Sequence, residues 1–241
     1  MDVSPNTLEQ YPIGGLEVEM ETSPSVFSPT STSQLLASVV QIAPGAEVLD
    51  LGCGVGVLAI FAALKGAGSV YAVDIMEEAC ELARVNAERN NVGDRVRVLR
   101  GDLFEPVGTQ TFDVIIDDVS GMADEVARLS PWFPPPIPTG GSDGTEHVVR
   151  MLEGVAGHLR EGGFLYFPVL SLSNTDRILR AARGVFGERL EQIAAVDFPF
   201  CAEFRGHEGR LNALREQRLI DFTTRRSRHF WGLRVYRAWL G

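Results

Sequence analysis

Three glycines set between two apolar runs constrain this chain more than any other feature. The first run, Val48 to Leu51, is short enough for a buried strand, and the second, Val55 to Leu64, is long enough for a packed helix. Gly52, Gly54 and Gly56 let the backbone turn sharply between them and approach a ligand closely. Doubly wound α/β folds bind nucleotides where a parallel strand turns into a helix N-terminus. The stretch therefore predicts a nucleotide-type site, and a glycine-rich turn without a ligand is the alternative.

The spacing of these glycines argues against a dinucleotide. Such a site typically has the pattern G-x-G-x-x-G, whereas here the third glycine is Gly56 and position 57 is Val57. An acid, Asp50, stands at the end of the first predicted strand. Its carboxylate would repel a pyrophosphate and attract a ligand that carries an ammonium or a sulfonium group.

Two further acids follow the next two predicted strands. The strand over 70–74 ends in Asp74, which lies 18 residues beyond the last glycine, an offset that suits hydrogen bonds to ribose hydroxyls. Ile75 would then lie against the adenine. Asp102 follows the next strand, over 95–99. Any one of these acids is usually a solvated loop residue, but three acids after three successive strands form a strong signal.

Together these residues resemble the class I S-adenosylmethionine-dependent methyltransferases. The resemblance implies an α/β fold with a Rossmann-like, doubly wound seven-stranded sheet, mostly parallel with an antiparallel last strand, and helices on both faces. It also implies a transferase with S-adenosylmethionine as its cofactor. The residues implied for cofactor binding are Asp50, Gly52, Cys53, Gly54, Gly56, Asp74, Ile75, Asp102 and Leu103.

The segment before the glycines resembles the "small" methyltransferase-domain group. Residues 1–15 read as a loose arm, residues 16–20 alternate as a short strand, and a helix is expected to end near Ile42, before Pro44. In that group, which includes ribosomal RNA guanine and release-factor glutamine methyltransferases, this segment covers the cofactor. Phe27 and Thr30 are therefore candidate wall residues, with packing on the sheet edge as the alternative. We expect residues 1–44 to form this segment, and 45–241 the methyltransferase domain.

The fourth predicted strand departs from the pattern of that group. The release-factor and ribosomal RNA enzymes have Asn-Pro-Pro-Tyr/Phe there, which grips a planar nitrogen, whereas this chain has Asp118-Val119-Ser120-Gly121. Asp117 and Asp118 stand where the acceptor should meet the cofactor, and we take them as candidate catalytic residues. Because side chains alternate along a strand, at most one of the two is expected to face the reacting centre.

A proline-rich stretch follows, over 130–142, and contains Trp132 and Phe133. Prolines stiffen the backbone and aromatic rings supply binding surface. We expect an ordered loop whose aromatic residues, with Phe27, form a wall of the substrate pocket. A loop packed on the sheet for stability is the alternative.

The carboxyl-terminal part contains an insert, at about 201–230, where related enzymes commonly have a tight hairpin. It holds a predicted helix over 208–219 and a basic cluster of Arg225, Arg226 and Arg228. That cluster could meet an anionic substrate or partner. Neutralisation of nearby acids at the surface is the alternative.

Composition limits the possible partners and compartments. The 241-residue chain carries a net charge of −10, which implies no general affinity for nucleic acid or anionic membranes. Its apolar stretches are too short to span a membrane. Three cysteines without metal-ligand spacing suit a reducing compartment, so the predicted location is cytoplasmic, with no metal. The oligomeric state is left open.

The leading hypothesis is a methyltransferase that acts on a small-molecule or peptide acceptor. The altered acceptor motif also suits another reaction of the same cofactor, such as aminocarboxypropyl transfer or internal cyclisation with release of methylthioadenosine. A third hypothesis is a catalytically inactive, cofactor-binding regulatory subunit. The three acids that follow successive strands favour an enzyme over the third hypothesis.

Overall fold

A computed structural model describes residues 6–133 and 137–241 of the chain. In chain order its elements are β1 (Thr7–Ile13), β2 (Leu16–Thr22), α1 (Ser31–Val39), β3 (Glu47–Leu51), α2 (Val57–Leu64), β4 (Ser69–Asp74), α3 (Glu77–Arg89), β5 (Val96–Arg100), η1 (Glu105–Val107), β6 (Phe112–Asp117), α4 (Asp124–Leu129), α5 (Glu146–Gly154), η2 (Val155–Gly157), β7 (Leu159–Leu170), α6 (Thr175–Phe186), β8 (Leu190–Pro199), η3 (Ala202–Phe204), α7 (Glu208–Glu216), β9 (Thr223–Arg225) and β10 (Arg228–Ala238).

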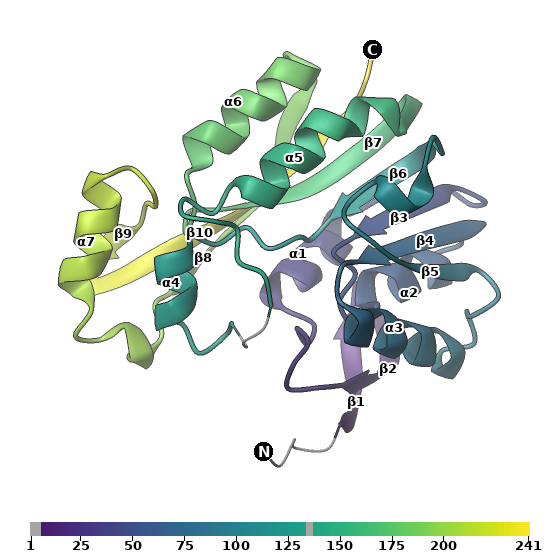
Figure 1. The fold of residues 1–241 in the computed structure, drawn as a ribbon, viewed down its shortest axis with the longest axis horizontal. Coiled ribbons are helices and arrows are strands. Elements are labelled where there is room, and N and C mark those ends of the chain that lie inside the picture. The colour runs from purple at the N-terminus through teal and green to yellow at the C-terminus, as the bar shows by residue number, and fades with distance from the viewer. Residues whose placement is uncertain (1–5, 134–136) are drawn as a thin grey trace.

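The main sheet has the strand order β5-β4-β3-β6-β7-β10-β8, and the short strand β9 pairs only with β10. The first five strands of this order are parallel, while β10 runs antiparallel to both β7 and β8. Helices α1, α2 and α3 pack on one face, and α5 and α6 on the other (Figure 1). The predicted doubly wound sheet of seven strands with an antiparallel last strand is therefore confirmed, and β9 is an addition.

Hydrophobic patterning explains this arrangement of layers. The central strand β3 is covered on both faces, and α2 buries every residue from Val57 to Ala63. Helix α3 buries one stripe, which includes Ala79, Leu82 and Ala83, and exposes its charged side. Parallel strands with both faces covered are expected to be nearly continuous in apolar residues, as β3 and β6 are.

The predicted loose arm over residues 1–15 is wrong for the described part of that segment. Residues of β1 pair in antiparallel register with β2, from Thr7 opposite Thr22 to Ile13 opposite Leu16. Gly14 and Gly15 close this hairpin with φ angles of 54° and 80°, a backbone that glycine adopts without steric cost.

Side chains of α3 hold the other edge of this hairpin. Asn86 accepts a hydrogen bond from the Glu21 N–H over 2.7 Å and donates to the Glu21 carbonyl over 2.9 Å. One helical turn later, Asn90 does the same for the N–H and carbonyl of Glu19. The two amides thus satisfy backbone groups of β2 as a neighbouring strand would.

The amino-terminal segment shares its core with the sheet. Ile13, Val18 and Leu36 belong to the same hydrophobic cluster as α2 and α3. Helix α1 ends at Val39, short of the expected end near Ile42. The domain boundary at residue 44 stays a prediction.

The insert over 201–230 packs against α4 and the start of β10. Phe204, Leu211 and Phe222 are buried with Val126 and Trp231 in a third hydrophobic cluster, separate from the two that flank the sheet. These elements form the protrusion at the left of Figure 1. Within the described residues, none of the helices has the length and hydropathy that a membrane crossing requires.

Candidate active site

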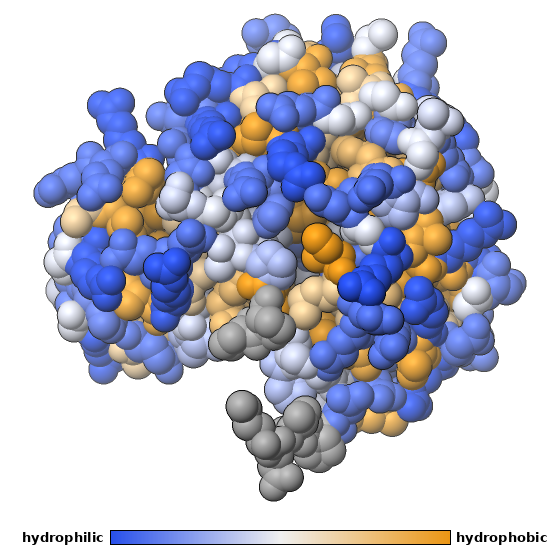
Figure 2. All heavy atoms as spheres, in the orientation of Figure 1, coloured by the Kyte–Doolittle hydropathy of each residue, from blue (hydrophilic) through white to orange (hydrophobic). Residues whose placement is uncertain are grey.

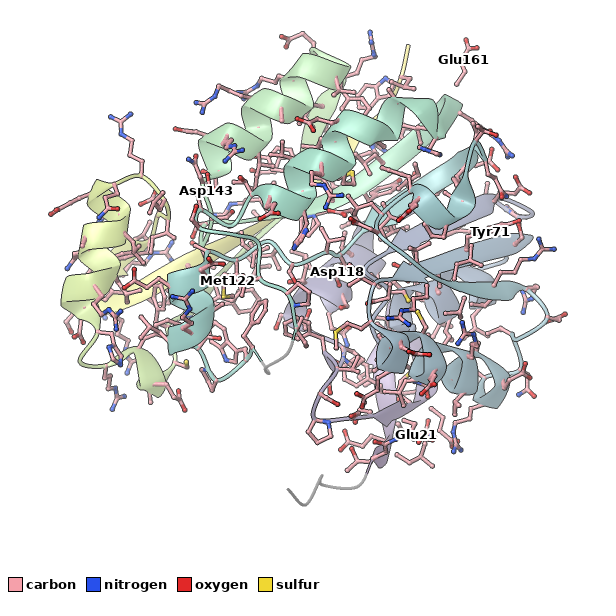
Figure 3. All side chains as sticks on the ribbon, viewed as in Figure 1. Glu21, Tyr71, Asp118, Met122, Asp143 and Glu161 are labelled. Carbon is pink, nitrogen blue, oxygen red and sulfur yellow. The ribbon has the colours of Figure 1, made fainter. Side chains whose placement is uncertain are left out.

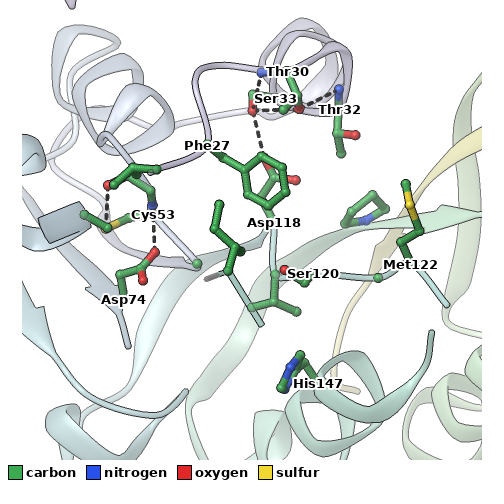
Figure 4. Close-up of a pocket in the computed structure, with 18 of the residues that line it drawn as sticks. Phe27, Thr30, Thr32, Ser33, Cys53, Asp74, Asp118, Ser120, Met122 and His147 are labelled. Atoms are coloured by element: carbon green, nitrogen blue, oxygen red, sulfur yellow. Dashed lines mark hydrogen bonds between the residues drawn. The ribbon is translucent and has the colours of Figure 1, made fainter. Parts of the chain in front are cut away.

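A cavity of about 780 Å³ opens at the carboxyl edge of the parallel strands. Its wall includes the turn after β3, the residues after β4, β5 and β6, and the segment that leads into α1. Figure 4 shows residues that line this cavity. Figure 2 shows apolar residues in a hollow near the centre of the face that is turned toward the viewer. This edge is where open α/β sheets bind ligands.

The glycine turn forms the floor of the cavity at β3. The N–H groups of Gly52 and Cys53 both donate to the Val73 carbonyl, over 2.9 and 3.0 Å. Gly52 has a φ of 73°, and a Cβ at this position would lie 3.0 Å from the backbone N and Cα of Val119. Gly54 also lines the cavity, with a φ of 51°. Only glycine therefore fits the turn where it passes under the cavity.

Gly56 was predicted to contact the cofactor, but it does not line the cavity. It caps the start of α2 with a φ of 89°, and a Cβ there would lie 3.0 Å from the Ala83 Cβ. Its physical role is therefore close packing of α2 against α3.

Cys53 lines the cavity as a buried thiol. Burial raises the pKa of this thiol well above its ordinary value, and the Asp74 carboxylate acts in the same direction. The thiol is therefore protonated at neutral pH, a state that does not suit a nucleophile.

Asp74, the last residue of β4, lies on the cavity wall. Its Oδ2 accepts from the Gly54 N–H and its Oδ1 from the Met76 N–H, both over 2.9 Å. Burial raises the pKa of Asp74, while these backbone donors act to lower it. Ile75, which follows, lines the same wall and is 51% exposed, so its side chain remains available to a ligand.

Asp102 and Leu103 line the wall beyond β5. The Arg150 guanidinium on α5 donates to Asp102 Oδ2 over 2.7 Å and leaves Oδ1 without a described partner. Leu103 has a φ of 48°, an uncommon backbone conformation for a residue other than glycine. Strain of this kind is frequent at ligand sites.

Asp50, the first of the predicted cofactor acids, does not reach the cavity. It is fully buried and pairs in register with Ala72 and Ile116, two positions before the level of Asp74. Neither carboxylate oxygen has a hydrogen-bond partner among the described residues. Burial raises the pKa of Asp50 well above its ordinary value, and the charge of Asp118 adds to the effect. Asp50 therefore lies below the edge of the sheet and not on the cavity wall, and its contact with the cofactor stays a prediction.

The two candidate catalytic acids separate as strand alternation predicts. Asp117 is fully buried, without a hydrogen-bond partner among the described residues, and does not line the cavity. Burial raises the pKa of Asp117 well above its usual range. Its side chain lies on the other side of β6 from Asp118, and a catalytic role for Asp117 stays a prediction that this placement does not support.

Asp118 does line the cavity, near the centre of the molecule (Figure 3). Its Oδ2 accepts a hydrogen bond from the Ser33 hydroxyl over 2.8 Å. Burial raises the pKa of Asp118 to about 7, and the hydrogen bond from Ser33 acts in the opposite direction. Its pKa suits a group that exchanges protons at neutral pH.

Aromatic rings form the outer wall of the cavity. Phe27, from the segment before α1, meets Phe133 edge to face with ring centroids 4.9 Å apart. Trp132 lies 5.9 Å from Trp231 of β10, which stacks on Phe198 of β8 at 4.8 Å. The predicted wall residues Phe27, Trp132 and Phe133 all lie at the cavity, while 134–136 are outside the described residues.

Sequence reasoning missed several members of this wall. Ser33 and Trp231 line the cavity, although nothing in their local sequence marks them as site residues. Thr30 caps α1 in a capping box with Ser33, which was the one available signal for this helix start. Arg150 reaches the cavity from α5. These residues come from distant segments, so only the tertiary fold brings them together.

The sequence of this chain is similar to those of known methyltransferases. Residues 29–142 match the family described as ribosomal protein L11 methyltransferase (PrmA). A release factor glutamine methyltransferase of Gloeobacter violaceus is 35% identical over 166 residues, which are 64% of this chain and 58% of that protein. A Methanocaldococcus jannaschii protein named as a protein glutamine methyltransferase is 29% identical over 198 residues, 76% of this chain and 91% of that protein. The chain thus spans less than two thirds of the Gloeobacter relative.

A solved structure shares the fold. A 16S rRNA methyltransferase of T. thermophilus, in complex with S-adenosylmethionine and guanosine, superposes with a TM-score of 0.62 over 99% of this chain and 51% of that one, at 19% identity.

These comparisons correct the predicted partners. The relatives are named for release factors, ribosomal protein L11 and protein glutamine, all of which are macromolecular acceptors. The prediction of a small-molecule or peptide substrate, without general nucleic-acid binding, is therefore wrong. That prediction depended on the net charge of the chain and on the altered motif after β6. Neither feature indicates whether an acceptor is a small molecule or a macromolecule.

Proposed function

We propose, on the premise that this chain belongs to the class I S-adenosylmethionine-dependent methyltransferases, that it methylates a nitrogen atom of a protein. The observation that carries the proposal is the composition of the cavity wall. One part of the wall holds the glycine turn and Asp74, another holds the aromatic rings, and Asp118 belongs to the same cavity. A cofactor and an acceptor side chain can therefore share this cavity of about 780 Å³.

The residues at the glycine turn fit the cofactor. Gly52 and Gly54 offer a turn without side chains, where a Cβ on Gly52 would meet the backbone of Val119. We assign Asp74 to the ribose hydroxyls, since its oxygens retain lone pairs beyond the two backbone hydrogen bonds. We assign Ile75 and Leu103 to the adenine ring and the free oxygen of Asp102 to its amino group. When bound, S-adenosylmethionine supplies a methyl group that its sulfonium has already activated.

The chain's own task is then to align the acceptor and to handle one proton. Alignment of two reactants can contribute roughly 7–11 kcal/mol to lowering the barrier. Asp118 Oδ1, which is not engaged by Ser33, can accept an N–H from the acceptor and take the proton that the nitrogen loses. The rings of Phe27, Phe133 and Trp132 form an apolar wall on that side of the cavity.

Nitrogen is favoured as the acceptor atom for two reasons. A carboxylate accepts hydrogen bonds and offers none when ionised, so Asp118 suits a group with N–H bonds. The Gloeobacter and Methanocaldococcus relatives are named for glutamine, which carries its transferable hydrogens on an amide nitrogen. Release factors and ribosomal proteins work in the cytoplasm, so the proposal includes a cytoplasmic location.

Two measurements test the proposal. Calorimetry with S-adenosylmethionine and S-adenosylhomocysteine should detect binding to the wild-type chain and a large loss of affinity in Asp74→Ala. Incubation with methyl-labelled cofactor, a purified release factor or ribosomal protein L11 should place label in the protein band, whereas free glutamine and lysine should remain unlabelled. Absence of cofactor binding would end the proposal, and release of methylthioadenosine in place of S-adenosylhomocysteine would contradict the reaction.

A further inference from the structure

The insert carries a charge opposite to that of the rest of the protein. We call residues 201–230, which include η3, α7 and β9, the arginine lobe. It holds seven arginines and four acidic residues, whereas the rest of the chain has 15 Lys and Arg against 28 Asp and Glu. Residues of the lobe are buried with α4 and β10 in the third hydrophobic cluster, so this charge belongs to a packed part of the fold.

Three of the seven arginines already have acidic partners. Arg210 pairs with Glu125 over 2.8 Å, Arg215 with Asp221 over 3.0 Å, and Arg225 with Asp197. The others are exposed and form no salt bridge with any described residue; they are Arg205, Arg218, Arg226 and Arg228. A basic cluster at a surface usually neutralises nearby acidic side chains. These four arginines pair with no described acid, so that explanation does not apply to them.

The arginine lobe is continuous with the cavity mouth. Phe204 of η3 lies 5.5 Å from Trp132, which lines the cavity, and Arg205 follows Phe204 directly. On β10, Arg228 stands three residues before Trp231, another cavity residue, a separation of about 10 Å along an extended strand. A chain bound on the lobe can thus reach the cavity within a few residues.

We infer that the arginine lobe binds an acidic segment of the protein acceptor and so directs a neighbouring side chain into the cavity, an inference that rests on the proposed methyl transfer to a protein. The four guanidinium groups of the lobe that pair with no described acid attract carboxylates, and the acidic remainder of the enzyme repels them, which restricts binding to this face. A segment of the protein acceptor is favoured over RNA, because the Gloeobacter and Methanocaldococcus relatives are named for glutamine in a protein.

The test uses the full chain and a fluorescent peptide of about ten glutamates, with binding followed by anisotropy at low and at near-physiological salt. Arg226→Glu/Arg228→Glu should weaken binding by about tenfold or more, and the remaining binding should depend less on salt. The matched control is Arg180→Glu/Arg183→Glu on α6, which changes two exposed arginines away from the lobe and should alter the affinity by less than about twofold.

Several results would overturn the inference. These are an equal loss in the α6 control, no binding of the peptide by the wild-type chain at low salt, or tighter binding of a single-stranded uridine oligonucleotide than of the peptide. Calorimetry with S-adenosylhomocysteine on the same samples separates the two proposals. If the wild-type chain binds S-adenosylhomocysteine but not the peptide, only the docking surface is rejected. If the wild-type chain does not bind S-adenosylhomocysteine, the proposed function itself is rejected.

Discussion

The Ser33 hydroxyl donates a hydrogen bond of 2.8 Å to Asp118 Oδ2 and so joins two segments 85 residues apart in the chain. Ser33 belongs to the first turn of α1 and Asp118 follows β6, so this contact ties the segment over the cavity to the edge of the sheet. It also stabilises the ionised form of Asp118. The hydrogen bond therefore links the position of the covering segment to the protonation of the candidate base.

Removal of this hydroxyl is expected to make Asp118 a weaker acid. Burial holds the pKa of Asp118 at about 7, and loss of the hydrogen bond in Ser33→Ala should move its titration midpoint to higher pH. Carbon-13 NMR of labelled aspartate carboxyls measures this midpoint. Ser38→Ala, which alters another serine near the end of the same helix, should leave the midpoint unchanged. An unchanged midpoint in Ser33→Ala would show that the contact does not stabilise the carboxylate.

Asp118→Asn should greatly reduce kcat and leave the affinity for the cofactor nearly unchanged. An amide cannot take a proton, so we expect kcat to fall by about 10² or more, while the Kd for S-adenosylhomocysteine changes by less than about threefold. Asp117→Asn is the matched control, since Asp117 does not line the cavity. Its kcat should stay within about fivefold of wild type. Equal losses in the two variants would argue against Asp118 as the proton acceptor.

Stability should depend on the ionisation of Asp50. Burial raises the pKa of Asp50, so the folded state binds more protons than the unfolded state between the two pKa values. The contribution of Asp50 to the free energy of unfolding is fully present below the pKa that this group has in the unfolded chain. It is lost as the pH rises through the pKa of Asp50 in the folded protein. Asp50→Asn should therefore gain Tm relative to wild type at pH 8 and little at pH 4.

Thermal unfolding at the two pH values measures the gain, and about 1 kcal/mol would appear as a difference of about 2–4 °C. Asp94→Asn, at a side chain 82% exposed, should show no such pH-dependent gain. A gain of the same size at both pH values would mean that the amide stabilises the fold for reasons other than ionisation.

Gly52→Ala should weaken cofactor binding in addition to the stability that it loses through backbone strain. Gly52 and Gly45 have similar φ angles of 73° and 78°, but only at Gly52 would a Cβ meet other atoms, those of the Val119 backbone. Both variants should lose about 1 kcal/mol of stability from backbone strain. Calorimetry should show at least about tenfold weaker cofactor binding in Gly52→Ala alone. Equal affinities in the two variants would contradict the role assigned to the turn.

Asn86→Ala should loosen the amino-terminal hairpin. Asn86 is fully buried and makes three hydrogen bonds to backbone groups, two with Glu21 and one with the Val55 carbonyl. Their loss leaves buried backbone groups unpaired, and we expect about 3 kcal/mol of destabilisation in urea unfolding. Asn212→Ala, on the exposed side of α7, is the control and should be neutral. Protection of the β2 amides in hydrogen exchange should fall in the first variant only.

The succession of strands and helices around the glycine turn, and the place of the ligand edge, could be predicted because their signals are local. A strand, a glycine turn and a helix are encoded within about 20 residues, Asp74 is the last residue of β4, and Asp102 follows β5. The amino-terminal hairpin could not be predicted, and residues 1–15 were expected to form a loose arm. This hairpin depends on the pairing of β1 with β2 and on side chains of α3, which lies far from it in the sequence.

The sequence by itself determined the doubly wound sheet, the glycine turn and the cofactor class, since each arises from residues close together in the chain. Only the tertiary structure decided which acids reach the cavity. Asp50 lies two register positions below Asp74, and Asp117 lies on the other side of β6 from Asp118. A shift of one residue along a strand turns a side chain to the opposite face, and the motif alone does not state where the sheet ends. For the same reason Ser33 and Trp231 joined the site only once the distant segments had packed together.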